Sequence, residues 1–387
     1  MITGKRLIIT LSLSLLFLNG LSAQTRVRHE LAIPDILGYE TLICDFHTHT
    51  VFSDGNVWPT VRPEEAWREG LDVIAITDHV EYLPHKDDIN IGFNRSYEIA
   101  KPLGDALKIT VLRGGEITRS MPPGHSNAIF LEDVAALKTE NWEDAYAAAA
   151  DQGAFIFWNH PGWKGQQKDG IPRWYDEHTM LAEKGWMHGM EVVNGWEYYP
   201  EAHAWCLEKG ITMLANSDIH DPIHMDVNFH SHDDERNHRP VTLVFAKDNT
   251  PKSIKDALMD RRTALYAGNR LIGEERYLLP MFMQSVSFDE RSIQLRGRQR
   301  VYLQVTNSSE LDYELTLMES AENLEIPESI TLYGESTVLF PVRATDKNIT
   351  GSESYELQYR VENCLVKPNE GMPVNFKLKV RFYPAAP

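Results

Sequence analysis

Short apolar segments alternate with helix-like segments between about residues 40 and 280, and this alternation constrains the fold more than any other feature of the chain. Seven of these segments are predicted as strands: Leu42–Phe46, Val73–Thr77, Ile109–Arg113, Ala154–Trp158, Met190–Val193, Ile211–Ala215 and Val241–Phe245. Strands that alternate with helices pair in parallel, because each helix carries the chain back to the same end of the sheet. We therefore predict a parallel, barrel-like α/β domain over residues 24–282.

The hydrophobic pattern changes after about residue 283. Short segments there alternate apolar and polar residues, and turn residues such as Asn307-Ser308-Ser309 separate them. A period of two residues is typical of strands that bury one face. We predict a small antiparallel β-sandwich over residues 283–387.

The N-terminus has the pattern of a secretory signal peptide. Lys5 and Arg6 precede an apolar run from Leu7 to Leu18, and the small residue Ala23 offers a cleavage point. An uncleaved anchor is the alternative, but the run is short for a membrane span. We expect residues 1–23 to be removed and the mature chain to be exported, periplasmic or extracellular, with no membrane span. Its three cysteines are too few and too widely spaced for a disulfide framework.

The formal net charge of −18 disfavours binding to a nucleic-acid polymer or to an anionic membrane. It does not exclude a small anionic substrate, since bound divalent cations would reverse the sign of the charge locally.

Histidines and carboxylates follow the predicted strands at the point where each strand ends. His47 and His49 follow the first strand, and they point the same way because side chains alternate along a strand. Two imidazoles one residue apart form a natural chelating pair. Further polar residues follow later strands: Asp78 and His79, Glu116 and His125, His160, and Asp218 and His220. One such residue is explained by a structural hydrogen bond, but five positions at one edge of a barrel favour a metal site.

These residues resemble the motifs of the PHP family, named for polymerase and histidinol phosphatase domains. The matching motifs lie within roughly residues 40–280 and keep the family's order: His47-Thr48-His49 with Asp54, Thr77-Asp78-His79, Glu116, His125, His160 and Asp218-Ile219-His220. The runs Trp58-Pro59, Thr118-Arg119 and Pro123-Gly124-His125-Ser126-Asn127 look like those of exported PHP phosphodiesterases that carry a C-terminal β domain.

The resemblance implies a distorted seven-stranded (β/α)7 barrel that holds three divalent metal ions, which would be Zn, Mn or Fe. The first ion would be bound by His47, His49, Glu116 and Asp218. Glu116 would bridge to a second ion, completed by His125 and His160. Asp54, His79 and His220 would bind the third ion. Many family members have histidine at the position of Asp54, and the carboxylate here favours a harder cation.

Two further residues are predicted to act in catalysis. Arg119 is the first candidate to hold a phosphate oxygen, ahead of Arg62 and Arg95, because arginine can hold phosphate through two parallel hydrogen bonds. Asp78 either orients a ligand imidazole or caps a helix after its strand. The tryptophans near the expected site either form walls for an organic leaving group or pack within loops: Trp58, Trp163, Trp174 and Trp196.

The expected function is therefore an exported phosphoesterase that uses metal-activated hydroxide on a small phosphodiester or, less favoured, a phosphomonoester. Two alternatives stay open: a metal-dependent hydrolase of C–O or C–N bonds, and an exported metal-containing binding protein. The partner of the β domain is left open between a carbohydrate, another protein, the barrel itself and a second copy of the chain.

Overall fold

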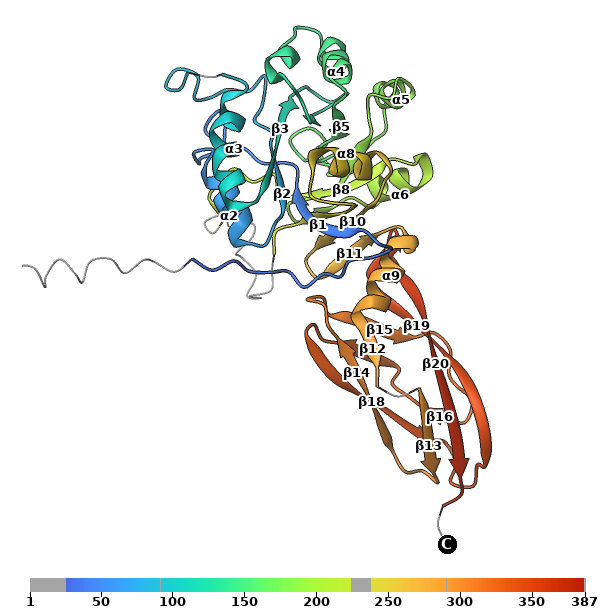
Figure 1. Ribbon diagram of the computed structural model, residues 1–387. Helices are drawn as coiled ribbons and strands as arrows, with labels where there is room; N and C mark the ends of the chain where they lie inside the picture. The colour runs from blue at the N-terminus through green and yellow to red at the C-terminus, as the bar shows by residue number, and fades with distance from the viewer. Residues whose placement is uncertain (1–25, 91, 224–237, 290, 386–387) are drawn as a thin grey trace, which may run out of the picture.

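The computed structural model describes residues 26–90, 92–223, 238–289 and 291–385, so the predicted signal peptide lies outside it. Figure 1 shows a helix-covered barrel joined through α9 to an elongated β domain, whose far tip carries the C-terminus. Within the described ranges, every helix is too short or too polar to cross a membrane. All three cysteines are buried and free.

The barrel sheet has the strand order β11-β10-β9-β1-β2-β3-β4-β5-β6, and β8 pairs with β6. It contains the seven predicted strands, and β4, β10 and β11 are additional to them. The strands span Glu40–Asp45 (β1), Val73–Ile76 (β2), Thr110–Ile117 (β3), Ser126–Ile129 (β4), Phe155–Trp158 (β5), Gly189–Asn194 (β6), Glu197–Tyr198 (β7), Thr212–Asn216 (β8), Val241–Ala246 (β9), Thr263–Ala267 (β10) and Arg270–Gly273 (β11). One threonine links β8 to β9: the Thr242 hydroxyl donates to the Ala215 carbonyl and accepts from the Ala215 amide, both at 2.9 Å.

The α/β barrel class is confirmed, but several of its strands pair antiparallel with their neighbours, among them β7 with β6, β10 with β9 and β11 with β10. β4 pairs antiparallel with both β3 and β5. The loop between β3 and β4 is short and contains no helix, so the chain cannot cross over to run parallel. β9 pairs antiparallel with β1. These antiparallel pairings are how the barrel departs from a regular parallel (β/α) barrel.

Helices cover the outside of the barrel. They span Val61–Arg68 (α2), Arg95–Leu107 (α3), Trp142–Asp151 (α4), Asp176–Glu183 (α5), Pro200–Lys209 (α6), Pro251–Met259 (α8) and Glu275–Ser285 (α9), with a 3₁₀ turn at Val134–Leu137 (η1). Local capping fixes several ends: Asn141 and Thr250 accept hydrogen bonds from backbone amides at the starts of α4 and α8. Gly210 ends α6 as predicted, at a φ of 68° that favours glycine.

The C-terminal part is the predicted β-sandwich. Its strands span Val286–Phe288 (β12), Ser292–Arg296 (β13), Val301–Asn307 (β14), Tyr313–Leu317 (β15), Leu324–Glu325 (β16), Ser329–Leu332 (β17), Ser336–Ala344 (β18), Gly351–Lys367 (β19) and Glu370–Tyr383 (β20). One sheet has the order β12-β14-β18-β16, and the other contains β13, β20, β19, β15 and β17. Buried and exposed residues alternate along β13 and β14, which is the period from which the sandwich was predicted.

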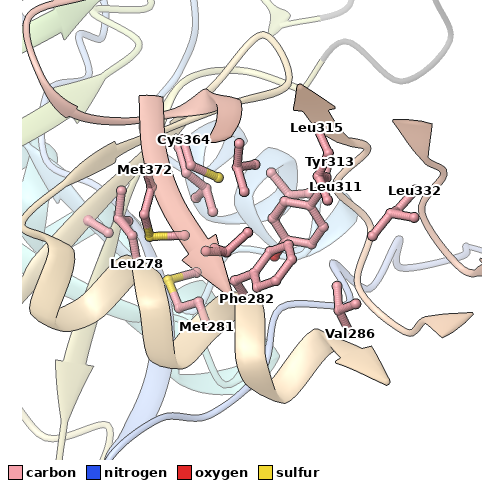
Figure 2. Close-up of a cluster of buried hydrophobic side chains, with 14 of the residues drawn as sticks. Leu278, Met281, Phe282, Val286, Leu311, Tyr313, Leu315, Leu332, Cys364 and Met372 are labelled. Atoms are coloured by element: carbon pink, nitrogen blue, oxygen red, sulfur yellow. The ribbon is translucent and has the colours of Figure 1, made fainter. Parts of the chain in front are cut away.

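The two domains share one sheet and one hydrophobic core. β11 of the barrel pairs in parallel with β19 of the sandwich, in the register Leu271 to Cys364 and Ile272 to Leu365. Figure 2 shows α9 contributing Leu278, Met281 and Phe282 to a cluster that also contains residues of the sandwich, among them Tyr313, Leu315, Cys364 and Met372. The sandwich therefore packs against the barrel through a shared core and is not joined to it by a flexible linker alone.

Candidate metal centre

The candidate ligands from the two halves of the barrel meet through short backbone contacts beyond the strand ends. Thr48 forms a parallel bridge with Ile219, and the amide of Asp218 donates to the His47 carbonyl at 3.0 Å. His79 forms a second parallel bridge, with Glu116. The continuations of β1 and β8, and of β2 and β3, therefore bring their polar residues to one place.

Backbone strain marks two of these residues. His160 and Asp218 have positive φ values of 27° and 55°, which side chains with a Cβ seldom adopt. Such conformations persist where surrounding contacts over-determine them, and they cluster at functional sites.

Glu116 lies at the centre of the cluster and is fully buried. Its Oε2 atom is 3.3 Å from the Nε2 atoms of both His47 and His49, and 3.1 Å from Nδ1 of His79. Its Oε1 atom is 2.8 Å from Nδ1 of His125 and 3.7 Å from Nε2 of His160. One carboxylate thus contacts five imidazoles, as a bridging ligand would.

Asp218 and Asp54 approach different ring nitrogens of His49, Nε2 and Nδ1 respectively. Oδ1 of Asp218 is 3.1 Å from Nε2 of both His47 and His49. Oδ1 of Asp54 is 3.2 Å from Nε2 of His220 and 3.5 Å from Nε2 of His79. The turn that carries Asp54 needs glycine at position 55, since a Cβ there would lie 2.7 Å from the backbone of His49.

The ligand atoms fall into three overlapping groups whose members lie within 4.8 Å of one another. The groups are His49, Asp54, His79 and His220; His47, His49 and Glu116; and His79, Glu116 and His125. They correspond to the three predicted ion sites, except that His49 and His79 are each shared between two groups and that Asp218 and His160 fall outside them. The number of ions and the ligand set of each stay predictions.

The residues fit divalent cations. Among the described residues, several buried polar atoms of the cluster have no hydrogen-bond partner: Nε2 of His49, Oδ1 of Asp54, Oε1 of Glu116, Nδ1 of His125 and Nδ1 of His160. Buried polar atoms left unpaired are costly, and metal coordination is one way to satisfy them.

The electrostatics of the cluster also favour cations. Burial alone would raise the pKa of Glu116, but the imidazoles of His79, His47 and His125 hold it well below its usual value. Neighbouring histidines likewise lower the pKa of Asp54 and of Asp218 against the effect of burial. Burial lowers the pKa of His49, but the carboxylates of Asp218 and Glu116, 3.1 and 3.3 Å from its Nε2 atom, outweigh burial and raise the pKa to about 10. All three carboxylates are therefore ionised at neutral pH and attract positive charge.

A cavity of about 520 Å³ opens onto the cluster. Its wall includes seven of the nine candidate ligands together with Tyr82, Thr118 and Trp163. A metal centre at this position would be accessible to a small substrate, unlike a closed four-ligand structural site.

The chain is similar to known proteins in sequence and, for one of them, also in fold. A crystal structure of a two-domain protein from Bacteroides vulgatus, containing a predicted PHP-like metal-dependent phosphoesterase, matches 92% of this chain and 100% of its own at 42% identity and a TM-score of 0.85. The chain belongs to the PHP family. An uncharacterized protein of Methanocaldococcus jannaschii is 27% identical over 190 residues, which cover 46% of this chain and 81% of that protein. A family model described as an Ig-like domain matches residues 286–377.

Asp78 of this PHP protein supports a ligand-bearing turn. Its carboxylate accepts hydrogen bonds from the Thr50 amide at 2.6 Å, the Thr50 hydroxyl at 2.8 Å and the Ser53 hydroxyl at 2.9 Å. The Ser53 hydroxyl in turn lies 3.3 Å from Nδ1 of His49. Asp78 therefore orients its neighbours through this turn. The alternative of a helix cap is wrong, because the described residues between β2 and the start of α3 at Arg95 form no helix.

Arg119 does not point at the ligands. Its guanidinium pairs with Glu81 at 2.8 Å and donates to the carbonyl oxygens of Thr139 and Glu140. With this charge already paired, the contacts do not support a phosphate clamp. Arg62 is buried and donates to four loop carbonyls, including those of His49 and His220, so it is a structural residue.

Sequence reasoning missed Glu191, a fully buried carboxylate on β6. Its Oε1 atom is 2.8 Å from Nδ1 of His47 and 2.9 Å from Nδ2 of Asn216. Its Oε2 atom accepts from the His160 amide at 2.7 Å and from Nδ2 of Asn194 at 2.8 Å. A carboxylate that accepts a hydrogen bond from Nδ1–H fixes the tautomer in which Nε2 of His47 is free to bind metal. The available signal was a glutamate within an otherwise apolar strand.

We expect Glu191→Gln to lower metal affinity by about 10- to 100-fold, the usual cost of losing such a partner. All four groups around the Glu191 carboxylate donate hydrogen bonds, so the NH₂ group of glutamine would face a donor on whichever side it lay. Chelator competition on the purified variant measures the affinity, with the exposed Glu208→Gln as the matched control. An affinity equal to that of the control would show that Glu191 does not orient the site.

Proposed function

We propose that this PHP protein is a metal-dependent phosphoesterase that prefers small phosphodiesters. The observation that carries the proposal is the open cavity lined by three carboxylates and four histidines. The carboxylates are those of Asp54, Glu116 and Asp218, and the histidines are His79, His125, His160 and His220. Family membership supports the reaction class. The substrate is proposed from the charge and shape of this cavity.

We propose three divalent ions, of Zn, Mn or Fe, held by the nine residues named above. Bound at this position, such ions supply Lewis-acid stabilisation of a phosphoryl group and lower the pKa of water. The chain itself contributes the ionised carboxylates that would hold the cations. Buried Glu191 orients the imidazole of His47, and buried Asp78 holds the turn beside His49. Mixed imidazole and carboxylate ligands suit all three metals, so chemistry alone does not choose among them.

The cavity wall favours a diester over a monoester. Among the described residues that line it, none is lysine or arginine. The ions must then balance the whole charge of the substrate, and a diester carries one negative charge where a monoester carries nearly two at neutral pH. The same wall contains Tyr82 and Trp163, which suit an organic ester group.

A substrate panel tests this proposal on the metal-loaded protein. We expect bis(p-nitrophenyl) phosphate to be hydrolysed at least about tenfold faster, in kcat/KM, than p-nitrophenyl phosphate, and both to exceed p-nitrophenyl acetate. A faster monoester would reverse the preference. Hydrolysis of the acetate alone would favour the competing function, a metal-dependent hydrolase of C–O or C–N bonds, and binding without turnover would favour a metal-containing binding protein.

We also propose that the mature chain is exported, on the basis of Lys5, Arg6 and the apolar run that follows them. The N-terminal sequence of the processed protein tests this proposal, which expects Gln24 as the first residue.

We retain the division into a barrel over residues 24–282 and a β domain over residues 283–387 as a proposal; α9 spans the boundary and the Ig-like match begins at residue 286.

A further inference from the structure

We propose that Trp163 and Tyr82 form an aromatic subsite, which binds a flat, uncharged ring esterified to the phosphate of the substrate. The inference rests on the proposed phosphoesterase function and specifies its substrate class. Both side chains line the metal cavity. Trp163 is 45% exposed and Tyr82 is 53% exposed, although both lie beside fully or largely buried ligands.

The indole of Trp163 contacts the ligands on one side of the cluster. Its ring centroid is 5.7 Å from that of His125 and 5.4 Å from that of His160, the latter in an edge-on arrangement. A group that occupies the cavity can therefore contact the indole while its phosphate lies at the metal ligands.

The loop that carries Trp163 holds the indole in place. The Trp163 amide donates to the His160 carbonyl at 2.9 Å, and the Trp163 carbonyl accepts from the amides of Gln166 and Gln167. The ring lies so close to the backbone of Gly165 that a Cβ at that position would collide with it. An aromatic ring that is fixed yet nearly half exposed is preorganised for binding, because little conformational entropy remains to be lost.

Tyr82 contacts a different ligand. Its ring centroid is 5.8 Å from that of His79, in an edge-on arrangement. The rings of His79 and His125 are themselves 5.7 Å apart. The two exposed aromatic side chains thus flank neighbouring ligands of the same cavity and can contact one substrate.

The other three candidate tryptophans lie elsewhere. Trp174 packs against Trp158 and Trp205. Trp196 packs against the cluster of Ile219 and Ile223. Trp58 lines a separate cavity with Phe52 and Phe93. Loop packing therefore explains Trp174 and Trp196, whereas it leaves the exposed indole of Trp163 at the metal cavity without an explanation.

The ring that this subsite accepts is uncharged. The described cavity wall offers no lysine or arginine to pair a second anionic group, and its carboxylates would repel one. Aromatic surface offers dispersion and stacking to a flat apolar ring. The structure thus points to aryl or similarly flat esters rather than to substrates with a second phosphate.

Binding of two monoanionic diester analogues tests the subsite without relying on turnover. Methyl phenylphosphonate and methyl methylphosphonate share the anionic head and differ in the ring. We expect titration calorimetry on the metal-loaded wild type to show the phenyl compound binding about five- to tenfold more tightly. Trp163→Ala should bring this ratio to about one to two while binding of the methyl compound and metal content stay unchanged; Trp163→Phe should retain part of the ratio.

Tyr82→Ala should also lower the ratio, and Tyr302→Ala should leave it unchanged, because Tyr302 is a 51% exposed tyrosine on β14 of the other domain. An unchanged ratio in Trp163→Ala would overturn the subsite. Equal loss of both affinities in Trp163→Ala would also overturn it and would make the indole a support for the ligands. If Trp163→Ala loses metal, the ratios of Trp163→Phe and Tyr82→Ala decide. Failure of the wild type to bind either compound or to hydrolyse any diester would instead contradict the phosphoesterase function.

Discussion

Replacing Glu116 with glutamine is expected to remove bound metal and to lower phosphodiester hydrolysis by at least about a thousandfold. The substitution keeps the shape of the side chain but removes the negative charge that lies within 3.3 Å of His47, His49, His79 and His125. A neutral amide cannot bridge two cations as a carboxylate does, and its NH₂ group would face imidazole nitrogens that must stay free to ligate. Elemental analysis and hydrolysis of bis(p-nitrophenyl) phosphate measure the two effects.

Glu356→Gln is the matched control for Glu116→Gln, because Glu356 is an exposed carboxylate on β19. The double variant His47→Ala/His49→Ala should behave like Glu116→Gln, since it removes the chelating pair that follows β1. Full metal content together with wild-type turnover in Glu116→Gln would contradict the assignment of the metal centre to this cluster.

Removal of residues 286–387 is expected to leave a barrel that does not fold stably. β11 would lose its parallel partner β19 and become an open edge, which invites aggregation. Leu278, Met281 and Phe282 of α9, all fully buried, would lose much of their apolar cover (Figure 2). Soluble yield and thermal unfolding of the fragment test this expectation. A soluble fragment that unfolds cooperatively and retains metal would show that the barrel is independent of the sandwich.

A point substitution on α9 tests the same interface in the full chain. Phe282→Ala should destabilise the protein by about 3–5 kcal/mol, the usual cost of removing a buried phenylalanine. The neighbouring Met283→Ala should cost far less, because Met283 is half exposed. Denaturant unfolding of both variants gives the difference directly, and equal midpoints would rule out tight packing of α9 between the domains.

Most of the candidate ligands were predictable because they follow a local pattern, a polar residue just past an apolar strand. Asp54 and His125 lie farther from the strand that precedes them, and the family resemblance placed them in the set. Glu191 has no such position: it sits within β6, so only the contact with His47 across the barrel reveals its role. The direction of Arg119 was not predictable either, since it depends on Glu81 and on a loop about twenty residues away.

Long-range pairing limited what the sequence could say about the fold. β4 has only four residues and follows β3 after a short loop, so its apolar pattern is too weak to predict a strand. The pairing of β11 with β19 joins residues about ninety positions apart, and no local sequence pattern predicts it. The sandwich strands were recognisable by their period of two, but the sharing of one core between both domains depends on tertiary packing.

Metal analysis of the purified protein tests the central claim most directly. Ions are counted in the protein as isolated, then stripped with a chelator and restored while hydrolysis of bis(p-nitrophenyl) phosphate is followed. We expect three divalent ions for each chain, loss of hydrolysis on stripping, and recovery with Zn, Mn or Fe. A stripped protein that hydrolyses the diester at its original rate, or a chain that binds less than one ion with metal in excess, would contradict the account.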